Sequence, residues 1–546
     1  MVVSVEGLTV ALPAGADRAF AVEDVTLSVA AGEVLCVVGE SGSGKSVTAN
    51  AVIGLLPEGV EPVAGRIVME GRDLLTLPDA ERRAMRGRDI AMVFQEPMTA
   101  LNPLMRIGDQ IAEVFEAHDA LGARERRARA LTLVEEVGLP DPEKILRAYP
   151  FQLSGGQRQR VMIAMALALE PKLLIADEPT TALDVTTQAQ ILRLIGDLQE
   201  RHGMAVLFIT HDIGVVAEIA DRVTVMRYGR VVEEGQASQV IAAAQHPYTQ
   251  ALIAAVPSLI PPAPRTLPVV PPALTVEGLS KTFRSGGGFF AKAREVRAVN
   301  DVSFELRRGE TLGIVGESGS GKSTAGRCIV RLLEPDGGSL HLGAADWGAL
   351  EASALRAERH RVQMIFQDPY ASLNPRSRIA RILTEGPVAN GTSREQALAR
   401  AQELLEIVGL DTGALDRFPH EFSGGQRQRI GIARALALEP EVLVADEAVS
   451  ALDVSVQAQV LELLRDLRDR LNLSLIFITH DLCVAAQVCD RILVMRRGVV
   501  VEMGATAEVF ATPRHEYTRA LLDAIPGWGA ESPLRKAFAE QAGAAQ

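Results

Sequence analysis

The sequence predicts an α/β protein made of two similar halves, each built on a parallel β-sheet. Three observations support this fold class. Long segments recur along the chain, continuous apolar runs that end in polar residues alternate with helical patterns, and a glycine-rich turn separates such a run from a helix in each half. Continuous apolar strands between helices are typical of parallel sheets that helices cover on both faces. Ligands of such sheets bind outside the carboxyl ends of the strands, so the polar residues there are candidate site residues.

The repeat is the most informative feature of the chain. Matching residues are shifted by 277 positions at the glycine-rich turns and by 269 positions from Ser154 and Ser423 onward. The halves therefore differ in length before that point and agree after it. The recurring segments are "VVGESGSGKS" (37–46) and "IVGESGSGKS" (314–323), "VFQEPMTALNP" (93–103) and "IFQDPYASLNP" (365–375), "LLIADEPTTALD" (173–184) and "VLVADEAVSALD" (442–453), "LFITHD" (207–212) and "IFITHD" (476–481), and "HPYTQALIAAVP" (246–257) and "HEYTRALLDAIP" (515–526).

A proline-rich stretch, "VPSLIPPAPRTLPVVPPALTV" (256–276), separates the halves. Such a composition predicts a semi-rigid extended spacer. The opening pattern "VEGLT" (5–9) then returns as "VEGLS" (276–280). The expected organisation is a first domain with a short C-terminal tail at 1–257, a linker at 258–272, a second domain with its tail at 273–528, and a flexible C-terminal tail at 529–546.

Composition narrows the class of protein. A chain of 546 residues is too long for one hydrophobic core. The net charge of −13 disfavours a protein whose main task is to grip nucleic acid. No apolar run reaches the roughly 18–20 residues that span a bilayer, and the N-terminus lacks the layout of a signal peptide. We therefore expect a soluble, cytoplasmic chain that meets a membrane only through a partner.

The glycine-rich turns match the phosphate-binding P-loop, G-x-x-x-x-G-K-S. The glycines let successive N–H groups point into one concavity, and the next helix N-terminus adds partial positive charge. The lysine would reach the β and γ phosphates, and the serine hydroxyl would bind Mg²⁺. The candidate loop residues are Gly39, Glu40, Ser41, Gly42, Ser43, Gly44, Lys45 and Ser46, and Gly316, Glu317, Ser318, Gly319, Ser320, Gly321, Lys322 and Ser323.

Polar residues at three further strand ends complete the candidate catalytic set. Two neighbouring acids end one strand in each half; the first would hold Mg²⁺ and the second would polarise the attacking water. A histidine after the next apolar run is a candidate sensor of the γ-phosphate, and a glutamine after a third run can ligate Mg²⁺ or water. These residues are Asp177, Glu178, His211 and Gln95 in the first half and Asp446, Glu447, His480 and Gln367 in the second. Candidate Mg²⁺ ligands are Ser46, Gln95, Asp177, Ser323, Gln367 and Asp446.

The motif "SGGQ" supplies a second type of anion site. Serine is a good N-cap, and the helical apolar spacing that follows predicts a helix whose free N–H groups and hydroxyl face an anion. The residues are Ser154, Gly155, Gly156 and Gln157, and Ser423, Gly424, Gly425 and Gln426.

Taken together, these motifs resemble a tandem pair of ABC-type ATP-binding domains, in the family's order: Walker A, Q-loop, signature, Walker B, D-loop and H-loop, over about residues 1–528. The resemblance implies a RecA-like P-loop core, an antiparallel β subdomain and a helical subdomain that carries the signature. It also implies head-to-tail pairing of the two domains within the chain. Each P-loop would share its ATP with the other half's Ser-Gly-Gly-Gln, with Asp184 and Asp453 at the seam.

The resemblance extends to a subfamily. "FQEPMTALNP", "FQDPYASLNP" and the two "H-x-Y-T" tails are similar to the dipeptide/oligopeptide/nickel importers, including the fused peptide, microcin and glutathione importer ATPases. The resemblance implies that the chain binds ATP and Mg²⁺ and that the adenine ring stacks on Phe283. It also implies that two membrane permease subunits dock near 96–105 and 368–376, and that an extracytoplasmic substrate-binding protein acts with the chain through these subunits. The chain would lie at the cytoplasmic face of the inner membrane. The first-half match to Phe283 is Leu12, with Phe20 nearby. Neither tail contains cysteine, so no iron–sulfur cluster is expected.

Two other functions remain open at this point. Soluble tandem ABC ATPases act on ribosomes or DNA, but the ribosomal factors carry a long charged helical linker and the DNA-repair relatives carry zinc-binding cysteine pairs. This chain has neither feature. A regulatory scaffold with degraded ATP sites is the other alternative, and the intact acids of both halves argue against it.

Overall fold

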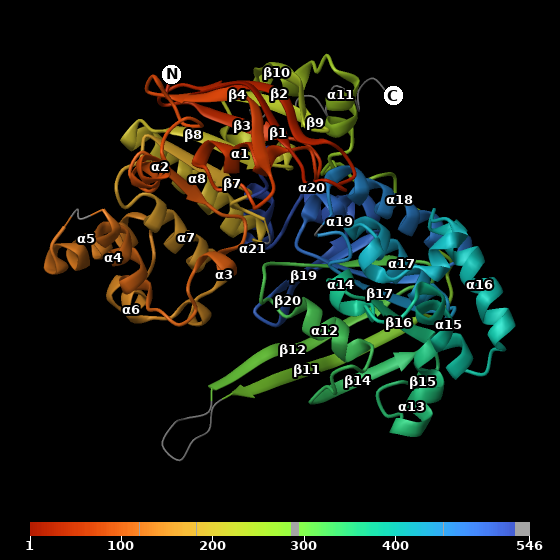
Figure 1. The fold of residues 1–546 in the computed structure, drawn as a ribbon. Coiled ribbons are helices and arrows are strands. Elements are labelled where there is room, and N and C mark those ends of the chain that lie inside the picture. The colour runs from red at the N-terminus through yellow and green to blue at the C-terminus, as the bar shows by residue number, and fades with distance from the viewer. Residues whose placement is uncertain (119–120, 182, 286–293, 451, 530–546) are drawn as a thin grey trace. The chain divides into compact units, whose positions relative to one another are not determined.

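The structure is a computed structural model that describes residues 1–118, 121–181, 183–285, 294–450 and 452–529. These residues form two compact units, Met1–Val256 with Ile525–Gln546, and Pro257–Ala524. The tail expected at 529–546 lies, from residue 530 onward, outside the described residues. Each unit is described by itself below (Figure 1).

Unit 1 contains two sheets in its described residues. The antiparallel sheet has the order β2-β1-β4-β5, and the six-stranded sheet has the order β10-β9-β3-β8-β7-β6. The neighbours from β9 to β6 run parallel, and β10 runs antiparallel to β9. The strands are β1 (Val3–Ala11), β2 (Phe20–Val29), β3 (Val34–Val38), β4 (Glu61–Met69), β5 (Arg72–Asp73), β6 (Ile90–Val93), β7 (Leu173–Asp177), β8 (Ala205–Thr210), β9 (Arg222–Arg227) and β10 (Arg230–Gln236).

Between β6 and β7 the chain of unit 1 forms an uninterrupted run of helices, α3 to α7. Helices α4, α5 and α6 pack against one another, α4 and α5 also pack against α7, and α7 packs against β6 (Figure 1). The helices are α1 (Lys45–Ile53), α2 (Asp79–Met85), α3 (Pro97–Ala100), α4 (Ile107–Ala117), α5 (Ala123–Glu136), α6 (Pro142–Arg147), the 3₁₀ turn η1 (Pro150–Gln152), α7 (Gly155–Ala166), α8 (Val185–His202), α9 (Ile213–Ile219), α10 (Ala237–Ala242) and α11 (Pro247–Ala254).

Unit 2 repeats this architecture, with sheet orders β12-β11-β14-β15 and β16-β17-β18-β13-β19-β20. Its strands are β11 (Leu274–Ser285), β12 (Arg294–Leu306), β13 (Thr311–Val315), β14 (Gly337–Leu342), β15 (Ala345–Asp346), β16 (Val362–Ile365), β17 (Val442–Asp446), β18 (Ser474–Thr479), β19 (Arg491–Arg496) and β20 (Val499–Ala505). Its helices are α12 (Lys322–Ile329), α13 (Ala352–Glu358), η2 (Arg359–Arg361), α14 (Pro369–Ser372), α15 (Ile379–Ala389), α16 (Arg394–Ile407), η3 (Thr412–Asp416), η4 (Pro419–Glu421), α17 (Gly424–Leu436), α18 (Val454–Leu471), α19 (Leu482–Val488), α20 (Thr506–Ala511) and α21 (Glu516–Asp523).

Strand β3 shows why the central strands are continuously apolar. Its side chains alternate between two cores: Leu35 and Val37 pack with the antiparallel sheet, whereas Cys36 and Val38 pack with the helices. A strand buried on both faces has no position for a polar side chain until it ends. The predicted parallel sheet and its covering on both faces are therefore confirmed, and the functional groups are confined to the strand ends.

The edge strand β10 is an exception within the predicted parallel sheet. Tyr228 and Gly229, between β9 and β10, have φ values of 49° and 83°, which form a tight hairpin turn with left-handed geometry. Arg497 and Gly498 repeat it at 49° and 84° in unit 2. A hairpin this short can join only antiparallel neighbours, so the last strand of each sheet reverses direction.

Candidate functional site

The P-loop of each unit fills the space between a buried strand and the following helix, and its glycines are required by geometry. Gly39 has φ of 151°, and a Cβ there would lie 2.2 Å from the carbonyl oxygen of Met226. Gly44 has φ of 100° and would place a Cβ 2.8 Å from the carbonyl oxygen of Ala21. A side chain at either position would displace backbone, so the loop keeps a concavity lined by main-chain groups.

The P-loop lysines are buried inside their own loops. Lys45 Nζ donates to the carbonyl oxygens of Gly39 at 2.7 Å and Glu40 at 2.9 Å. Lys322 makes the same two bonds in unit 2, at 2.7 Å and 2.9 Å. An ammonium group fixed at the mouth of a loop of backbone N–H groups is a strong donor for the oxygens of a phosphate.

The serine that follows each lysine meets the first acid of the strand-end pair. Ser46 Oγ donates to Asp177 Oδ1 at 3.0 Å, and Ser323 Oγ donates to Asp446 Oδ1 at 2.7 Å. Burial raises the pKa of both aspartates, which the serine hydrogen bonds oppose. A buried carboxylate beside a hydroxyl supplies the hard oxygen ligands that Mg²⁺ prefers, and the ion's charge would offset the cost of burial. The residues present therefore fit Mg²⁺.

The second acid of each pair is the centre of a polar cluster. Glu178 Oε2 accepts from Gln95 Nε2 at 2.9 Å, and Glu178 Oε1 lies 3.2 Å from Nδ1 of His211. In unit 2, Glu447 Oε2 accepts from Gln367 at 2.7 Å, and Oε1 lies 3.5 Å from Nδ1 of His480. The glutamine, glutamate and histidine predicted from separate strand ends are thus brought together in both units.

Burial and the glutamate–histidine contact shift the pKa values of this cluster in opposite directions. Burial alone would raise the pKa of Glu178, but the hydrogen bond and charge of His211 outweigh it and lower that pKa. Burial likewise would lower the pKa of His211, and Glu178 raises it above its ordinary value. Glu447 and His480 shift in the same directions for the same causes. The pair therefore favours an ionised carboxylate, the form that accepts a proton.

The glutamate of each cluster is also held in an uncommon backbone conformation. Glu178 and Glu447 have φ values of 46° and 47°, in the left-handed region that non-glycine residues rarely occupy. Each is fixed there by an N–H group that donates to the neighbouring strand, at Ile209 O (3.0 Å) and Ile478 O (2.9 Å). Such conformations cost of order 1–3 kcal/mol and concentrate at functional sites.

The signature motifs form the N-termini of α7 and α17, as predicted. Ser154 and Ser423 are N-caps, and each accepts from the N–H of the glutamine three residues later at 3.3 Å, which completes a capping box. The second glycine is sterically required, because a Cβ on Gly156 would lie 2.4 Å from Thr187 Cγ2 and one on Gly425 would lie 2.4 Å from Val456 Cγ1. The first glycine has room for a side chain, since a Cβ on Gly424 would meet nothing within 4 Å and one on Gly155 would make only an ordinary contact with Leu183 Cδ2 at 3.7 Å.

The structure does not join a signature to the P-loop of its own unit. Among the described residues, the side chains of the serine and glutamine of each signature hydrogen-bond only within their own capping box. The N-cap Asp184 accepts from the N–H of Thr187 at 2.9 Å, at the start of α8. The predicted adenine-stacking residue Phe283 lies on β11 and is 42% exposed, and Leu12 and Phe20 are half-buried. The stacking role stays a prediction.

Two tyrosines of the C-terminal tails touch the P-loops, a contact that the sequence interpretation missed. Tyr248 Oη accepts from the N–H of Glu40 at 3.1 Å, and Tyr517 Oη accepts from the N–H of Glu317 at 3.1 Å. Arg227 lies 4.7 Å above the ring of Tyr248, and Arg496 lies 4.7 Å above that of Tyr517. The sequence signal for this contact was the repeated tail, in which the tyrosine recurs with the same 269-residue shift as the two acids and the histidine.

A loop arginine of unit 1 also reaches the P-loop. Arg18, between β1 and β2, donates through Nη2 to the carbonyl oxygen of Gly42 at 2.5 Å. No motif predicted this residue, because the segment 12–19 matches no repeated segment. In the part of the chain that the structure describes, no helix is both long and apolar enough to span a bilayer.

Comparisons with known proteins show what this sequence is similar to. The family model described as "ABC transporter" matches residues 22–181 and 299–450, and "Oligopeptide/dipeptide transporter, C-terminal region" matches 232–293 and 501–545. The chain is 49% identical to the peptidoglycan transport ATP-binding protein YejF of Agrobacterium fabrum over 526 residues, covering 95% of this chain and 96% of that one. It is 48% identical to the glutathione import ATP-binding protein GsiA of Salmonella typhimurium over 557 residues, covering 96% and 89%. A solved dimeric ATP-binding cassette bound to ADP and Pi is 32% identical, with a TM-score of 0.39, covering 43% of this chain and 98% of that one.

Proposed function

This chain belongs to the ABC transporter family, and we propose that it is the subunit whose ATP hydrolysis drives the import of a peptide or peptide-like compound. The observation that carries this proposal is the complete cluster of P-loop lysine, Mg²⁺-binding pair, glutamate, histidine and glutamine in both units. The alternative of a soluble ATPase acting on ribosomes or DNA is not supported by the comparisons. The intact second cluster also disfavours a scaffold with degraded sites.

The substrate class rests on the chemistry shared by the relatives' names. Glutathione is a tripeptide, peptidoglycan contains short peptides, and the tail model is that of oligopeptide and dipeptide transporters. We therefore assign compounds with peptide bonds. In this role the ATPase supplies energy and does not itself need to touch the cargo.

Hydrolysis follows from the roles of the chain's own residues. Lys45 and the N–H groups of residues 39–46 would bind the phosphates, and Ser46, Asp177 and Gln95 would hold Mg²⁺. Bound Mg²⁺ supplies positive charge that stabilises the charge developing on the phosphate oxygens. Glu178, kept ionised by His211, accepts a hydrogen bond from the attacking water and orients it toward the γ-phosphate. Lys322, Ser323, Asp446, Gln367, Glu447 and His480 would act in the same way at the second site.

Each site is proposed to be completed by the signature of the other half, in head-to-tail pairing. The first site would use Ser423–Gln426, and the second would use Ser154–Gln157. Two features support this proposal. The signature residues make no hydrogen bond to their own unit's P-loop in the described residues, and the open first glycine leaves the start of α17 accessible to a phosphate.

We further propose that two membrane permease subunits dock beside the Q-loops, which places the chain peripherally at the inner membrane. In unit 1 the segment after Gln95 exposes apolar side chains: Met98 is 55% exposed, Leu104 85%, and Phe151 lies near the signature at 64%. Exposed apolar patches favour a protein interface. In unit 2 the matching positions are Tyr370, Arg376 and His420, so the two docking surfaces would suit two different subunits.

Reconstitution tests this function. The full chain would be co-purified with its two membrane subunits, and ATPase activity measured with the substrate-binding protein and defined peptides. We expect stimulation by peptide-loaded binding protein, and loss of it in the Glu178→Gln, Glu447→Gln double variant. Leu104→Asp should weaken co-purification and leave the activity of the isolated chain unchanged. Basal ATPase without stimulation by any peptide would overturn the peptide assignment alone.

A further inference from the structure

The tyrosine of the first C-terminal tail is held in place by the start of its helix. Tyr248 is the second residue of α11, and its N–H donates to Nδ1 of the N-cap His246 at 3.1 Å. Glu233 on β10 accepts from the N–H groups of Gln245 at 2.7 Å and His246 at 3.1 Å. These bonds tie the helix to the sheet, and Tyr248 is only 7% exposed. Its hydroxyl group therefore has a fixed position.

This hydroxyl group meets the P-loop at a residue that also binds the loop's lysine. Tyr248 Oη accepts from the N–H of Glu40 at 3.1 Å, and the carbonyl oxygen of Glu40 accepts from Lys45 Nζ at 2.9 Å. One residue thus connects the tail to the ammonium group that is proposed to bind phosphate. A shift of Glu40 would move one of the carbonyl groups that orient this ammonium.

The phenol of Tyr248 also interacts with the carboxylate of Glu40. Burial raises the pKa of Tyr248 to about 12; the N–H of Glu40 opposes this shift, and the charge and hydrogen bond of the Glu40 carboxylate add to it. The phenol stays protonated at neutral pH, so it can donate to the carboxylate while it accepts from the N–H. Both the main chain and the side chain of Glu40 are therefore bound to the tail.

A carboxylate in this loop would oppose phosphate binding unless its position is fixed. Glu40 directly follows the first glycine of the P-loop, is half-buried, and carries a negative charge beside a concavity of N–H groups. Like charges repel over several ångströms, and the repulsion is stronger where protein replaces bulk water. A hydroxyl group that binds the carboxylate reduces the number of positions that the carboxylate can take near the phosphates.

Unit 2 repeats this contact with its own residues. Tyr517 Oη accepts from the N–H of Glu317 at 3.1 Å, and Lys322 Nζ donates to the carbonyl oxygen of Glu317 at 2.9 Å. The N–H of Tyr517 donates to Nδ1 of His515 at 3.0 Å, and burial raises the pKa of Tyr517 to about 12. The tails around the two tyrosines differ, "HPYTQ" against "HEYTR". The contact with the P-loop is therefore kept where neighbouring residues are not.

We propose that Tyr248 and Tyr517 are positioning residues of the two ATP sites, an inference that rests on the proposed binding of ATP by the P-loops. Each hydroxyl group fixes the glutamate of its own P-loop. The lysine is then oriented by a carbonyl group that does not move, and the carboxylate is held by the tail. The tail helix therefore raises the affinity of its own unit for ATP without touching the nucleotide.

Calorimetric binding of a non-hydrolysable ATP analogue with Mg²⁺ to the full chain tests the role of the hydroxyl group. Lys322→Ala disables the second site, so that the first is measured alone. In this background Tyr248→Phe should raise Kd by roughly five- to twentyfold. Tyr228→Phe is the matched control, because it removes the hydroxyl group of a tyrosine that is 71% exposed, and it should leave Kd unchanged. Tyr517→Phe in a Lys45→Ala chain should weaken the second site in the same way.

A double-mutant cycle tests whether the hydroxyl group acts through Glu40. When Glu40→Gln has removed the carboxylate charge, Tyr248→Phe should raise Kd by only roughly two- to threefold. An equal rise of Kd in both backgrounds would overturn action through the carboxylate. Thermal midpoints separate positioning from stability, because a lower midpoint of Tyr248→Phe with an unchanged Kd would overturn the proposal. Failure of the wild-type chain to bind the analogue would instead overturn the proposed function.

Discussion

Nδ1 of His211 lies 3.2 Å from Oε1 of Glu178, and His480 repeats the relationship with Glu447 at 3.5 Å. The two residues come from the ends of adjacent parallel strands, β7 and β8. Each stabilises the charged form of the other against the cost of burial. A glutamate whose pKa is lowered in this way stays ionised at neutral pH, so it can accept a hydrogen bond from the attacking water. The same arrangement in both units is the reason to expect two competent ATP sites.

The two signature glycines should separate stability from catalysis. Gly425→Ala places a methyl 2.4 Å from Val456 Cγ1, so overpacking of about 1–3 kcal/mol should lower the thermal midpoint. The methyl group of Gly424→Ala would have no atom within 4 Å, so the thermal midpoint should stay unchanged. The same methyl group should lower ATPase activity because it crowds the proposed phosphate contact. Thermal unfolding and steady-state ATPase measure both. Wild-type activity in Gly424→Ala would remove the support for a shared site at Ser423–Gln426.

Acid should weaken the attachment of the first tail helix. Burial alone would raise the pKa of Glu233, but the N–H groups of Gln245 and His246, which donate at 2.7 Å and 3.1 Å, lower it. A lowered folded-state pKa stabilises the protein above the ordinary value of 4.5, and this contribution is lost as the pH falls through the folded value. Glu233→Gln should therefore lower the thermal midpoint at pH 7, by roughly 2–4 °C for about 1 kcal/mol.

The difference between wild type and Glu233→Gln should shrink as the pH falls below 4.5, because the wild-type carboxylate becomes protonated. Calorimetric scans from pH 7 to pH 3.5 check this, with Glu58→Gln as an exposed control elsewhere in unit 1. A difference that stays constant across the range would show that the carboxylate charge contributes nothing to this contact.

Removal of Mg²⁺ should abolish hydrolysis and spare the fold. Ser46 and Asp177 are hydrogen-bonded to each other without an ion, and no group of three or more metal-binding side chains occurs in the described ranges. Excess EDTA should therefore leave the thermal midpoint of the nucleotide-free chain unchanged while ATPase activity is lost and returns on adding Mg²⁺. A midpoint that falls on chelation alone would point to a structural metal instead.

Local patterns predicted the strand ends and the loops of the site. An apolar run buried on both faces must end where polar residues begin, so Asp177, His211 and the P-loop follow from short windows of sequence. The hairpin at Tyr228 and Gly229 was not predicted. Both residues have left-handed φ values, but only one of them is a glycine, so the sequence signal for such a turn is weak. The reversed edge strand β10 follows from that turn.

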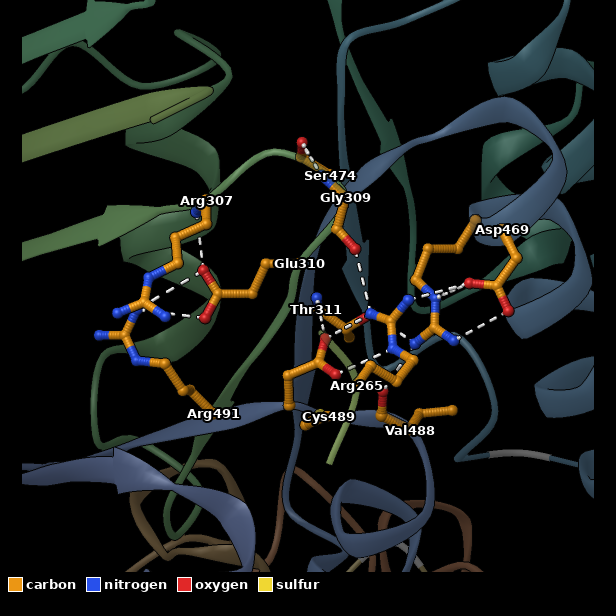
Figure 2. Close-up of polar contacts among 12 residues, drawn as sticks. Arg265, Arg307, Gly309, Glu310, Thr311, Asp469, Ser474, Val488, Cys489 and Arg491 are labelled. Atoms are coloured by element: carbon orange, nitrogen blue, oxygen red, sulfur yellow. Dashed lines mark hydrogen bonds and ion pairs between the residues drawn. The ribbon is translucent and has the colours of Figure 1, made fainter. Parts of the chain in front are cut away.

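Contacts between residues far apart in the chain could not be predicted from the sequence. Tyr248 reaches the P-loop across 208 residues, and no periodicity encodes that meeting. Arg265 likewise lies in a segment whose prolines predict an extended spacer, yet its side chain is bound between the carboxylates of Asp469 and Asp490, which are separated from it by more than 200 residues (Figure 2). Such pairings are set by packing of the whole unit, and the repeat of matching residues in the two halves is the one sequence signal that points to them.

The central claim is that both halves hydrolyse ATP with Glu178 and Glu447. Steady-state ATPase activity of wild type, Glu178→Gln, Glu447→Gln and the double variant tests it most directly, with ATP binding measured in parallel to verify intact sites. We expect each single variant to lose at least half of the activity and the double variant to lose about 10²-fold or more. Activity equal to wild type in Glu178→Gln, with the double variant no worse than Glu447→Gln alone, would contradict a catalytic first site.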